Sequence, residues 1–348
     1  MDNEIGKGSL NTHTKRSRVK RLLVQVLKNI GLYNSLRAAN RAIRLRKPAF
    51  QYHIRQLFGR GLDVTAQQHH RKDKVEPWPA ETACDLCSIS TLSTETSVDE
   101  LHLLLSSIQI HMPDVPVFLI ADTPTKTIIS NAFPDLNIHI STQLDRYHGL
   151  DRQGMEKQGI WLDFMLEKCT IIDLALSKTR NTLLVDADVV FLHPVPAVPD
   201  KNIGLSPHYV ASQHTDDFGI FNAGFVFVQH HAVTEWWRRK SKEDPGFFEQ
   251  QALDSAPNQF NAFEFPNQYN FGWWQLWLST NPQEVVNEFW IKDHKIYRND
   301  MPLISVHTHF VKRFNQRYTP FNDVIRRLAR LSKDPQLIDL VSRNPYIE

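Results

Sequence analysis

Two aspartates interrupt an apolar run in the middle of the chain, where Asp186 and Asp188 are separated by a single alanine. Carboxylates within an apolar segment are costly to bury unless they are paired or bind a metal ion. Residues i and i+2 of a strand point to the same face, so we expect both side chains to converge on one cation, with small Ala187 leaving space. Hard oxygen ligands suit Mn²⁺ or Mg²⁺, which can bridge a diphosphate and neutralise a departing nucleotide. The alternative is a turn at a strand end whose acids cap the next segment.

Strands and helices alternate around this pair. Apolar runs predict strands over 86–92, 115–121, 136–140 and 181–185. Between them we expect a helix opened by a capping box at Ser97–Glu100, and further helices over 126–133 and 159–176. This alternation is typical of an α/β fold with parallel strands flanked by helices, in which ligands bind at the carboxyl ends of the strands.

The sequence divides into four predicted regions. Residues 1–55 are basic and carry an apolar helical stripe from Val19 to Ile30, so this extension could lie on an anionic membrane surface through residues 15–47 or pack on the main domain. Residues 56–82 are predicted to be a linker, 83–315 the catalytic domain, and 316–348 a tail of one or two amphipathic helices.

Composition excludes several classes of protein. The net charge of +2 over 348 residues does not favour a nucleic-acid-binding protein. The cysteines are Cys84, Cys87 and Cys169, a low and odd count that argues against a disulfide scaffold and suits a reducing compartment. No run of 18 apolar residues is present and the N-terminus lacks the apolar stretch of a secretory signal. We therefore expect a cytoplasmic enzyme, which is peripheral to a membrane if the basic extension lies on one.

Several motifs in this order resemble those of the GT-A glycosyltransferases, especially the retaining, galactosyltransferase-like branch that includes the glycogenins. The similar segments are Leu183–Val190, Phe221–Val228, Glu249–Leu253, Pro266–Asn270 and His307–Lys312. The resemblance implies a Rossmann-like mixed sheet flanked by helices, a nucleoside-diphosphate donor such as a UDP-sugar, a Mn²⁺ or Mg²⁺ cofactor, a glycan or lipid-linked acceptor, and retention of anomeric configuration.

The resemblance also implies roles for individual residues. Asp186 and Asp188 would bind the metal together with His307 or His309, because the family's glycine is missing from this last motif and the spacing to Lys312 is one residue short. Lys168 and Lys312 would face the donor phosphates, and Thr91 and Asp122 the base or ribose. Asn222 beside Gly224 would contact the sugar, and Gln250 and Glu249 would be the catalytic candidates on its β-face.

Other interpretations stay open at this point. A metal-dependent nucleotidyltransferase or phosphotransferase would share the carboxylates, although the sequence has no Gly-rich phosphate loop of the GxxxxGK[ST] type. A non-catalytic carbohydrate-binding scaffold could retain the fold. The tryptophans of 273–277 could form a sugar-stacking platform for the acceptor, whereas Trp236 and Trp237 are predicted to pack in the core.

Overall fold

The structure is a computed structural model, and it describes residues 62, 64, 82–210, 214–215, 218–243, 248–311 and 317–342. The basic extension predicted over 1–55 lies outside the described residues, as does the linker apart from Leu62, Val64 and Thr82. Lys312 also lies outside them. Among the described residues, no helix combines the length and apolar composition that crossing a bilayer requires.

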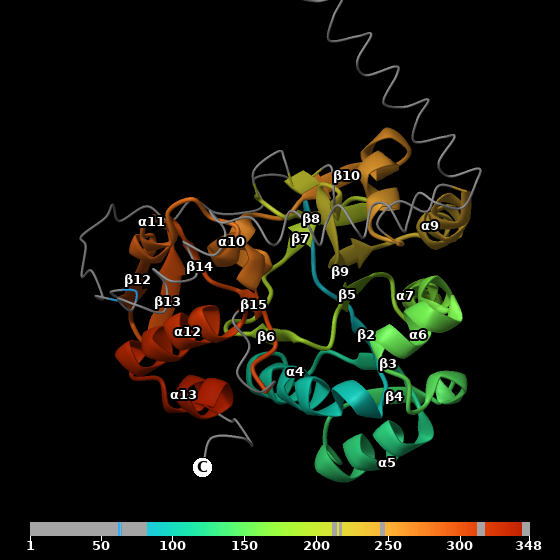
Figure 1. Cartoon of the computed structure of the whole chain (residues 1–348), viewed down its shortest axis with the longest axis horizontal. Helices are drawn as coiled ribbons and strands as arrows, with labels where there is room; N and C mark the ends of the chain where they lie inside the picture. The colour runs from blue at the N-terminus through green and yellow to red at the C-terminus, as the bar shows by residue number, and fades with distance from the viewer. Residues whose placement is uncertain are drawn as a thin grey trace, which may run out of the picture. The chain divides into compact units, whose positions relative to one another are not determined.

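A seven-stranded mixed sheet forms the centre of the part of the chain described from residue 82 onward (Figure 1). Strands β5, β2, β3 and β4 run parallel, β9 is antiparallel to β5, and β8 is antiparallel to β9. The strands in spatial order are β10 (Ala262–Glu264), β8 (Ile203–Pro207), β9 (Phe221–Val228), β5 (Thr182–Val185), β2 (Ile89–Ser93), β3 (Val117–Ala121) and β4 (Ile138–Ser141). The expected α/β class with a mixed sheet flanked by helices is confirmed.

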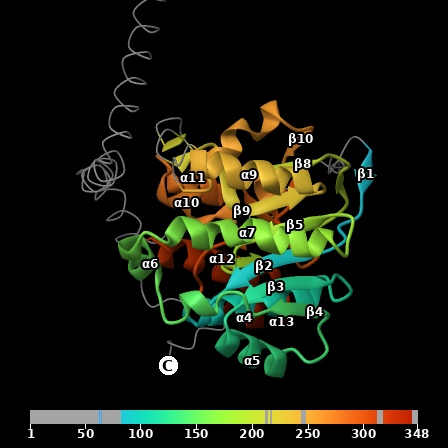
Figure 2. The same cartoon turned by 90° about the vertical axis from the view of Figure 1, so that its right-hand side faces the viewer.

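Helices cover both faces of this sheet because its strands are apolar on both sides. Leu183 and Val185 of β5 pack with helices α4 (Val98–His111) and α5 (Thr123–Ala132), while Leu184 faces the opposite side with α7 (Trp161–Leu176) and α9 (His231–Glu243). Figure 2 shows α7 lying across the central strands. Trp236 and Trp237 are buried in this second core, as predicted.

A third core lies beside the main sheet. Its sheet has the order β11 (Phe271–Gly272), β15 (Ser305–His307) and β6 (Val189–Phe191), and a second small sheet consists of β12 (Phe289–Lys292), β13 (Lys295–Arg298) and β14 (Met301–Pro302). Helices α12 (Thr319–Ser332) and α13 (Pro335–Ser342) form where amphipathic helices were predicted and bury their apolar faces here. Leu62 and Val64 pack against the same core, which joins the two C-terminal helices to the two smaller sheets.

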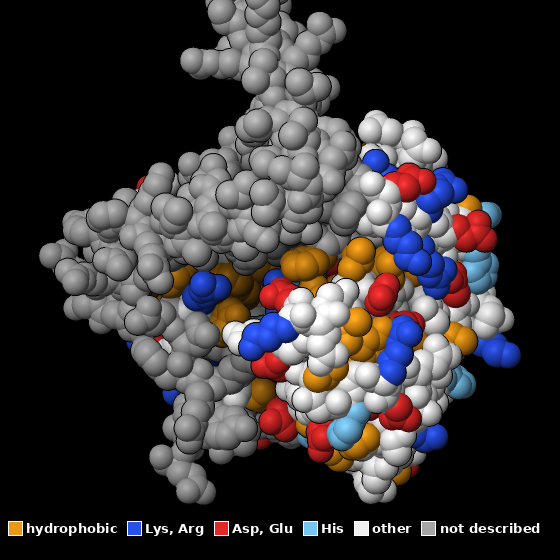
Figure 3. Space-filling model, turned by 45° about the vertical axis from the view of Figure 1, so that its right-hand side comes forward, with side chains coloured by type: hydrophobic (Ala, Val, Ile, Leu, Met, Phe, Trp, Pro, Cys, Tyr) orange, Lys and Arg blue, Asp and Glu red, His pale blue; other side chains and the backbone are white. Residues whose placement is uncertain are grey.

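The remaining elements are short. They are β1 (Ala83–Cys84), η1 (Glu95–Ser97), η2 (Asp145–Tyr147), α6 (Arg152–Gln158), β7 (Val198–Pro199), η3 (Gln251–Asn258), η4 (Asn267–Tyr269), α10 (Trp273–Trp277) and α11 (Pro282–Asn287). The three cysteines are free thiols, two of them buried, in agreement with the absence of a disulfide scaffold. On the face shown in Figure 3, cationic, anionic and hydrophobic side chains are interspersed among the described residues.

The predicted capping box is wrong. Ser97 occupies the N-cap of α4, but its side chain makes no capping bond and instead contacts Ser93 and Thr94. Glu100, the acid expected to complete the box, is 3% exposed and points away from the helix start toward His309. The helix forms because the apolar face of Leu101, Leu104, Leu105 and Ile108 is completely buried.

Candidate metal centre

Asp186 and Asp188 occupy a turn between two sheets. Strand β5 ends at Val185, and β6 begins in the smaller sheet at Val189. The amide of Val189 donates to the carbonyl of Asp186 at 3.1 Å, which closes the turn. The pair therefore lies at the carboxyl end of a buried strand, as expected, but the strand periodicity invoked to explain their convergence is wrong. The turn, rather than i, i+2 alternation, brings the two carboxylates together.

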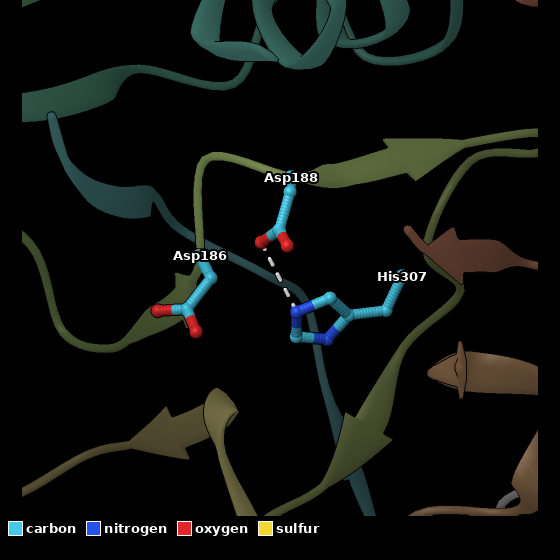
Figure 4. A group of neighbouring side chains, drawn as sticks. All are labelled: Asp186, Asp188 and His307. Carbon is cyan, nitrogen blue, oxygen red and sulfur yellow. Dashed lines mark ion pairs between the residues drawn. The ribbon is translucent and has the colours of Figure 1, made fainter. Parts of the chain in front are cut away.

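His307 completes the group at the end of β15. This strand pairs antiparallel with β6, which places His307 opposite Val189 and beside the Asp188 carboxylate. His307 Nε2 lies 3.1 Å from Asp188 Oδ1, and one potential ligand atom from each of Asp186, Asp188 and His307 falls within 4.8 Å of the others. Figure 4 shows the three side chains surrounding a common space. Two carboxylates and one imidazole are a donor set that suits Mn²⁺.

Gly224 makes room for this group. A Cβ at position 224 would lie 2.7 Å from His307 Cε1 and still closer to Asp186 Oδ2. Real side chains do not tolerate such contacts, so only glycine fits on β9 beside these two residues. The absence of a side chain here leaves the carboxylate and the imidazole free to face each other, and the residues present fit a divalent cation.

The charges around the site attract cations. Burial alone would lower the pKa of His307, but the negative charges of Asp188 and Asp186 and the hydrogen bond to Asp188 raise it above its ordinary value. The same negative field that favours a proton on His307 favours a divalent cation at this position.

Lys168 is an internal cation behind Asp186. Its Nζ lies 2.8 Å from Asp186 Oδ1 and 3.1 Å from Glu249 Oε1, and it donates to the carbonyl of Ala223. Burial would lower the pKa of Lys168, but Asp186 and Glu249 raise it, so the ammonium stays charged. Lys168 is therefore not a solvated lysine, because the residue is 3% exposed and its Nζ contacts two acids and a carbonyl. Its predicted contact with the donor phosphates stays a prediction.

His309 contacts the site from the outside. Its Nε2 lies 3.2 Å from Asp188 Oδ2, and its Nδ1 lies 3.2 Å from Glu100 Oε1. His309 does not belong to the group of converging ligand atoms within the described structure, whereas His307 does. Of the two histidines left open by the sequence, the structure favours His307 as the third ligand and places His309 where it can orient Asp188.

Asn222 and Gln250 are held by hydrogen bonds to the protein. Asn222 Oδ1 accepts from the amide of Gly224 at 3.0 Å and from Asn270 Nδ2 at 3.2 Å. Gln250 Oε1 accepts from the amide of Ala223 at 3.3 Å, while Gln250 Nε2 donates to the carbonyl of Phe218 at 2.6 Å. Asn222 therefore lies on the strand that carries Gly224 and Gln250 lies against it, and their roles toward a sugar stay predictions.

Thr91 and Asp122 are both buried away from solvent. Thr91 lies within β2, and Asp122 caps α5 by accepting from the amide of Thr125 at 3.2 Å. The other Asp122 oxygen accepts from the amide of Glu95 at 3.1 Å and contacts His148 Nδ1 at 3.0 Å. Their predicted contacts with a base or ribose stay predictions.

The tryptophans of α10 are divided between packing and exposure. Trp274 and Trp277 are each 7% exposed, and Trp274 packs its ring edge-on against His307 with 5.1 Å between ring centroids. Trp273 is half-buried and lies 5.1 Å from the ring of Tyr318, which in turn lies 4.7 Å from the ring of His309. Of these three tryptophans only Trp273 is partly exposed. The sugar-stacking platform predicted from the sequence could therefore include Trp273, together with Tyr318, but not Trp274 or Trp277.

Four residues of the site were not predicted from the sequence. Glu100 was interpreted as part of a capping box, Asn270 appeared only as one letter of a motif, and His208 and Tyr318 carried no signal. Their contacts come from segments far apart in the chain, so periodicity within one element could not reveal them.

Comparison with known proteins gives matches at the level of structure only. No protein-family model matches the chain, and no curated protein matches it. Two of the solved structures similar to it are mouse xyloside xylosyltransferase 1 in its apo form and galactosyltransferase LgtC in complex with donor and acceptor sugar analogues. The first has a TM-score of 0.44 and 9% identity, covering 66% of this chain and 99% of that chain. The second has a TM-score of 0.43 and 14% identity, and the match covers 70% of this chain and 95% of that chain. Both are named as transferases of a sugar, a xylosyl and a galactosyl group respectively.

Proposed function

We propose that this protein is a metal-dependent glycosyltransferase that moves a sugar from a nucleoside-diphosphate sugar, a UDP-sugar in our interpretation, to a glycan or lipid-linked acceptor. The observation that carries the proposal is the convergence of Asp186, Asp188 and His307 at the carboxyl end of β5 beside a glycine that leaves the space open. This is the edge of an α/β sheet where ligands bind. When bound, a divalent cation supplies a Lewis acid that neutralises the departing diphosphate.

The protein's own residues would position the sugar. Gly224 lets the backbone of β9 approach the donor, and the amides of Gly224 and Ala223 in this stretch fix the carboxamides of Asn222 and Gln250. Glu249 is 4% exposed and ion-paired with Lys168. We therefore favour Gln250 over Glu249 as the group facing the sugar. A glutamine is a poor nucleophile, so this choice favours attack by the acceptor itself on the anomeric carbon. The acceptor would approach from the face that the diphosphate leaves, which retains the anomeric configuration.

An acceptor would lie against the aromatic side of the site. The half-buried ring of Tyr318 contacts both His309 and the half-buried ring of Trp273, and indole and phenol faces stack on sugar rings. Sugar hydroxyls bound there would be close to the metal ligands without contacting the buried Trp274.

A hydrolysis screen tests the proposal. The protein is incubated with a panel of nucleotide sugars and Mn²⁺, and free sugar and nucleoside diphosphate are measured. We expect slow, EDTA-sensitive release of both products, and a loss of at least about 100-fold in Asp188→Ala, in keeping with the several kcal/mol that a catalytic metal contributes. Asp200→Ala, at an exposed aspartate paired with Arg180, is the matched control.

The products separate the alternatives. Release of pyrophosphate or of a nucleoside monophosphate would support a nucleotidyltransferase or phosphotransferase instead. Full activity of Asp188→Ala in the presence of EDTA would refute the metal assignment, and sugar binding without any turnover across the panel would point to a scaffold protein.

A further inference from the structure

A chain of hydrogen bonds runs from the backbone to the imidazole of His307. Its members are His208 at the end of β8, Asn222 on β9, Asn270 before β11 and His307 on β15, and all four residues are less than 9% exposed. The bonds between successive side chains are 3.4 Å from Asn222 to His208, 3.2 Å from Asn270 to Asn222, and 3.1 Å between Asn270 and His307. These hydrogen bonds connect the main sheet to the smaller sheet and end at His307, a candidate metal ligand.

The backbone fixes the direction of each bond in this chain. The amide of Gly224 can only donate, so the atom of Asn222 that it contacts at 3.0 Å must be the carbonyl oxygen. Asn222 Nδ2 is then a donor toward His208 Nε2. At its other nitrogen, His208 Nδ1 faces the carbonyl of Ile220 at 3.2 Å, which can only accept, so Nδ1 carries the proton. Burial lowers the pKa of His208 to about 4, in agreement with a neutral ring whose Nε2 accepts.

The hydrogen bonds of Asn270 determine which nitrogen of His307 carries a proton. Asn222 Oδ1 accepts, so the atom of Asn270 that approaches it at 3.2 Å must be Nδ2, which also donates to Ser206 Oγ at 3.0 Å. Asn270 Oδ1 is therefore the atom that faces His307 Nδ1. An amide oxygen only accepts, so Nδ1 of His307 must carry a hydrogen.

We propose that Asn270 is a positioning residue that holds His307 with its proton on Nδ1, so that the Nε2 lone pair is presented to a divalent cation shared with Asp188. Nε2 and Asp188 Oδ1 lie 3.1 Å apart. Without an ion, a protonated Nε2 donates a hydrogen bond to Asp188 Oδ1 at this distance, and a divalent cation would take the place of that proton while Nδ1 keeps its own. Metal-binding histidines ordinarily donate their second N–H to an acceptor that fixes the tautomer, and Asn270 is that acceptor here.

Two variants of Asn270 distinguish a role in orienting His307 from a role in packing alone. Asn270→Ala removes the acceptor, whereas Asn270→Asp keeps an acceptor oxygen for His307 Nδ1 but loses the bonds donated to Ser206 and Asn222. We expect Asn270→Ala to weaken Mn²⁺ binding by about 10- to 100-fold, the range typical of such supporting residues, and Asn270→Asp to stay within about threefold of the native protein. Asn287→Ala, an exposed change on α11, should bind as the native protein does.

Mn²⁺ affinity is measured by electron paramagnetic resonance of the free ion, and folding is verified by circular dichroism. Native affinity in Asn270→Ala would overturn the proposal. So would Asn270→Asp binding as weakly as Asn270→Ala, because packing alone would then explain both. A second measurement needs no variant that could unfold: ¹⁵N spectra of histidine-labelled, Zn²⁺-loaded protein should show the His307 proton on Nδ1, with the signal assigned by its loss in His307→Asn. A proton on Nε2 would refute the inference.

The inference rests on the metal site of the proposed function, but its readouts require no nucleotide sugar. Weakened Mn²⁺ binding in Asn270→Ala, together with no turnover of any nucleotide sugar, would support the inference and refute the proposed function. Sugar turnover by the native protein together with unchanged Mn²⁺ binding in Asn270→Ala would do the opposite.

Discussion

Glu100 and His309 are 209 positions apart in the chain, and Glu100 Oε1 lies 3.2 Å from His309 Nδ1. The other nitrogen of the same ring lies 3.2 Å from Asp188 Oδ2, so one imidazole connects a buried acid on α4 to a candidate metal ligand. The His309 segment is fixed further by Asn322 of α12, which donates to the carbonyl of His309 at 3.0 Å and accepts from Thr308 Oγ1 at 2.7 Å. Helices α4 and α12 thus hold the His309 segment beside the candidate ligand Asp188.

Glu100→Gln should weaken this support. The glutamine fills the same space, but it is a weaker acceptor for His309, which then orients Asp188 less firmly. We expect Mn²⁺ affinity to fall by about tenfold, the lower end of the range for residues behind a ligand. Titration calorimetry with Mn²⁺ measures the change, and Glu95→Gln, at an exposed glutamate, provides the matched control. Native affinity in Glu100→Gln would show that His309 needs no acid to orient Asp188.

Gly224→Ala should disrupt the metal centre directly. The new methyl group would lie 2.7 Å from His307 Cε1, so His307 and Asp186 must move apart. We expect Mn²⁺ binding to be lost, with a destabilisation of about 1–3 kcal/mol from overpacking. Gly154→Ala on α6 is the control, since its methyl group would meet only the side chains of Asp151 and Leu150. Retention of Mn²⁺ affinity in Gly224→Ala would contradict the site as described.

Lys168→Met should leave Glu249 buried without its cation. Removing one member of a buried ion pair typically costs about 3–5 kcal/mol of unfolding free energy. Denaturant unfolding measures this loss, and Lys178→Met, at an exposed lysine, should change stability by less than about 0.5 kcal/mol. Adding Mn²⁺ should raise the midpoint temperature of Lys168→Met more than that of the native protein, because the ion replaces positive charge beside Asp186. Equal shifts would indicate that Lys168 and the metal do not share Asp186.

Acid should destabilise the fold through His193. Burial lowers the pKa of His193 to about 4, below the value of about 6.5 expected in the unfolded chain. Between these pH values the unfolded state binds the proton and the folded state does not, so unfolding free energy decreases as pH falls from about 6.5 to about 4. The difference of about 2.5 pH units corresponds to about 3 kcal/mol.

His193→Asn removes the titrating group while keeping a donor for the carbonyl of Ile296. Its unfolding free energy, measured by urea denaturation across this pH range, should fall less steeply than that of the native protein. His139→Asn, at an exposed histidine, supplies the comparison. Parallel curves for the native protein and His193→Asn would exclude His193 as a source of acid sensitivity.

The basic extension is predicted to bind anionic membranes. Its apolar stripe from Val19 to Ile30 would enter the interface, and each Lys or Arg near the surface adds about 1 kcal/mol of attraction. Full-length protein should sediment with phosphatidylserine liposomes at low salt and release as salt rises, whereas protein lacking residues 1–55 should stay in solution with its Mn²⁺ binding intact. Reversing charge at Lys20 and Arg21 is the control that keeps the stripe. A truncated protein that unfolds would show instead that the stripe packs on the catalytic domain.

Local pattern was enough to predict the strands and helices that carry the site. The residues that lead to Val185 and Ala121 are consecutive apolar side chains, Leu183–Val185 and Val117–Ala121, because both faces of the sheet are covered, and this signal is contained in one segment. The same holds for Asp186 and Asp188, since two acids within such a run are costly without a cation. The capping-box prediction was wrong because the same spacing of Ser97 and Glu100 also occurs when the acid is buried and contacts a residue far away in the chain, here His309.

Relationships between segments were decided only by the tertiary structure. His307 and His309 have the same residue type and lie two positions apart, so the sequence could not distinguish them. Pairing of β15 with β6 places His307 opposite Val189, next to Asp188, while His309 continues past the strand to meet Glu100. The roles of Lys168 and Asn270 likewise depend on side chains 18 or more positions away. A charge or a hydrogen bond acts through space over a few ångströms, and only folding brings such partners within that distance.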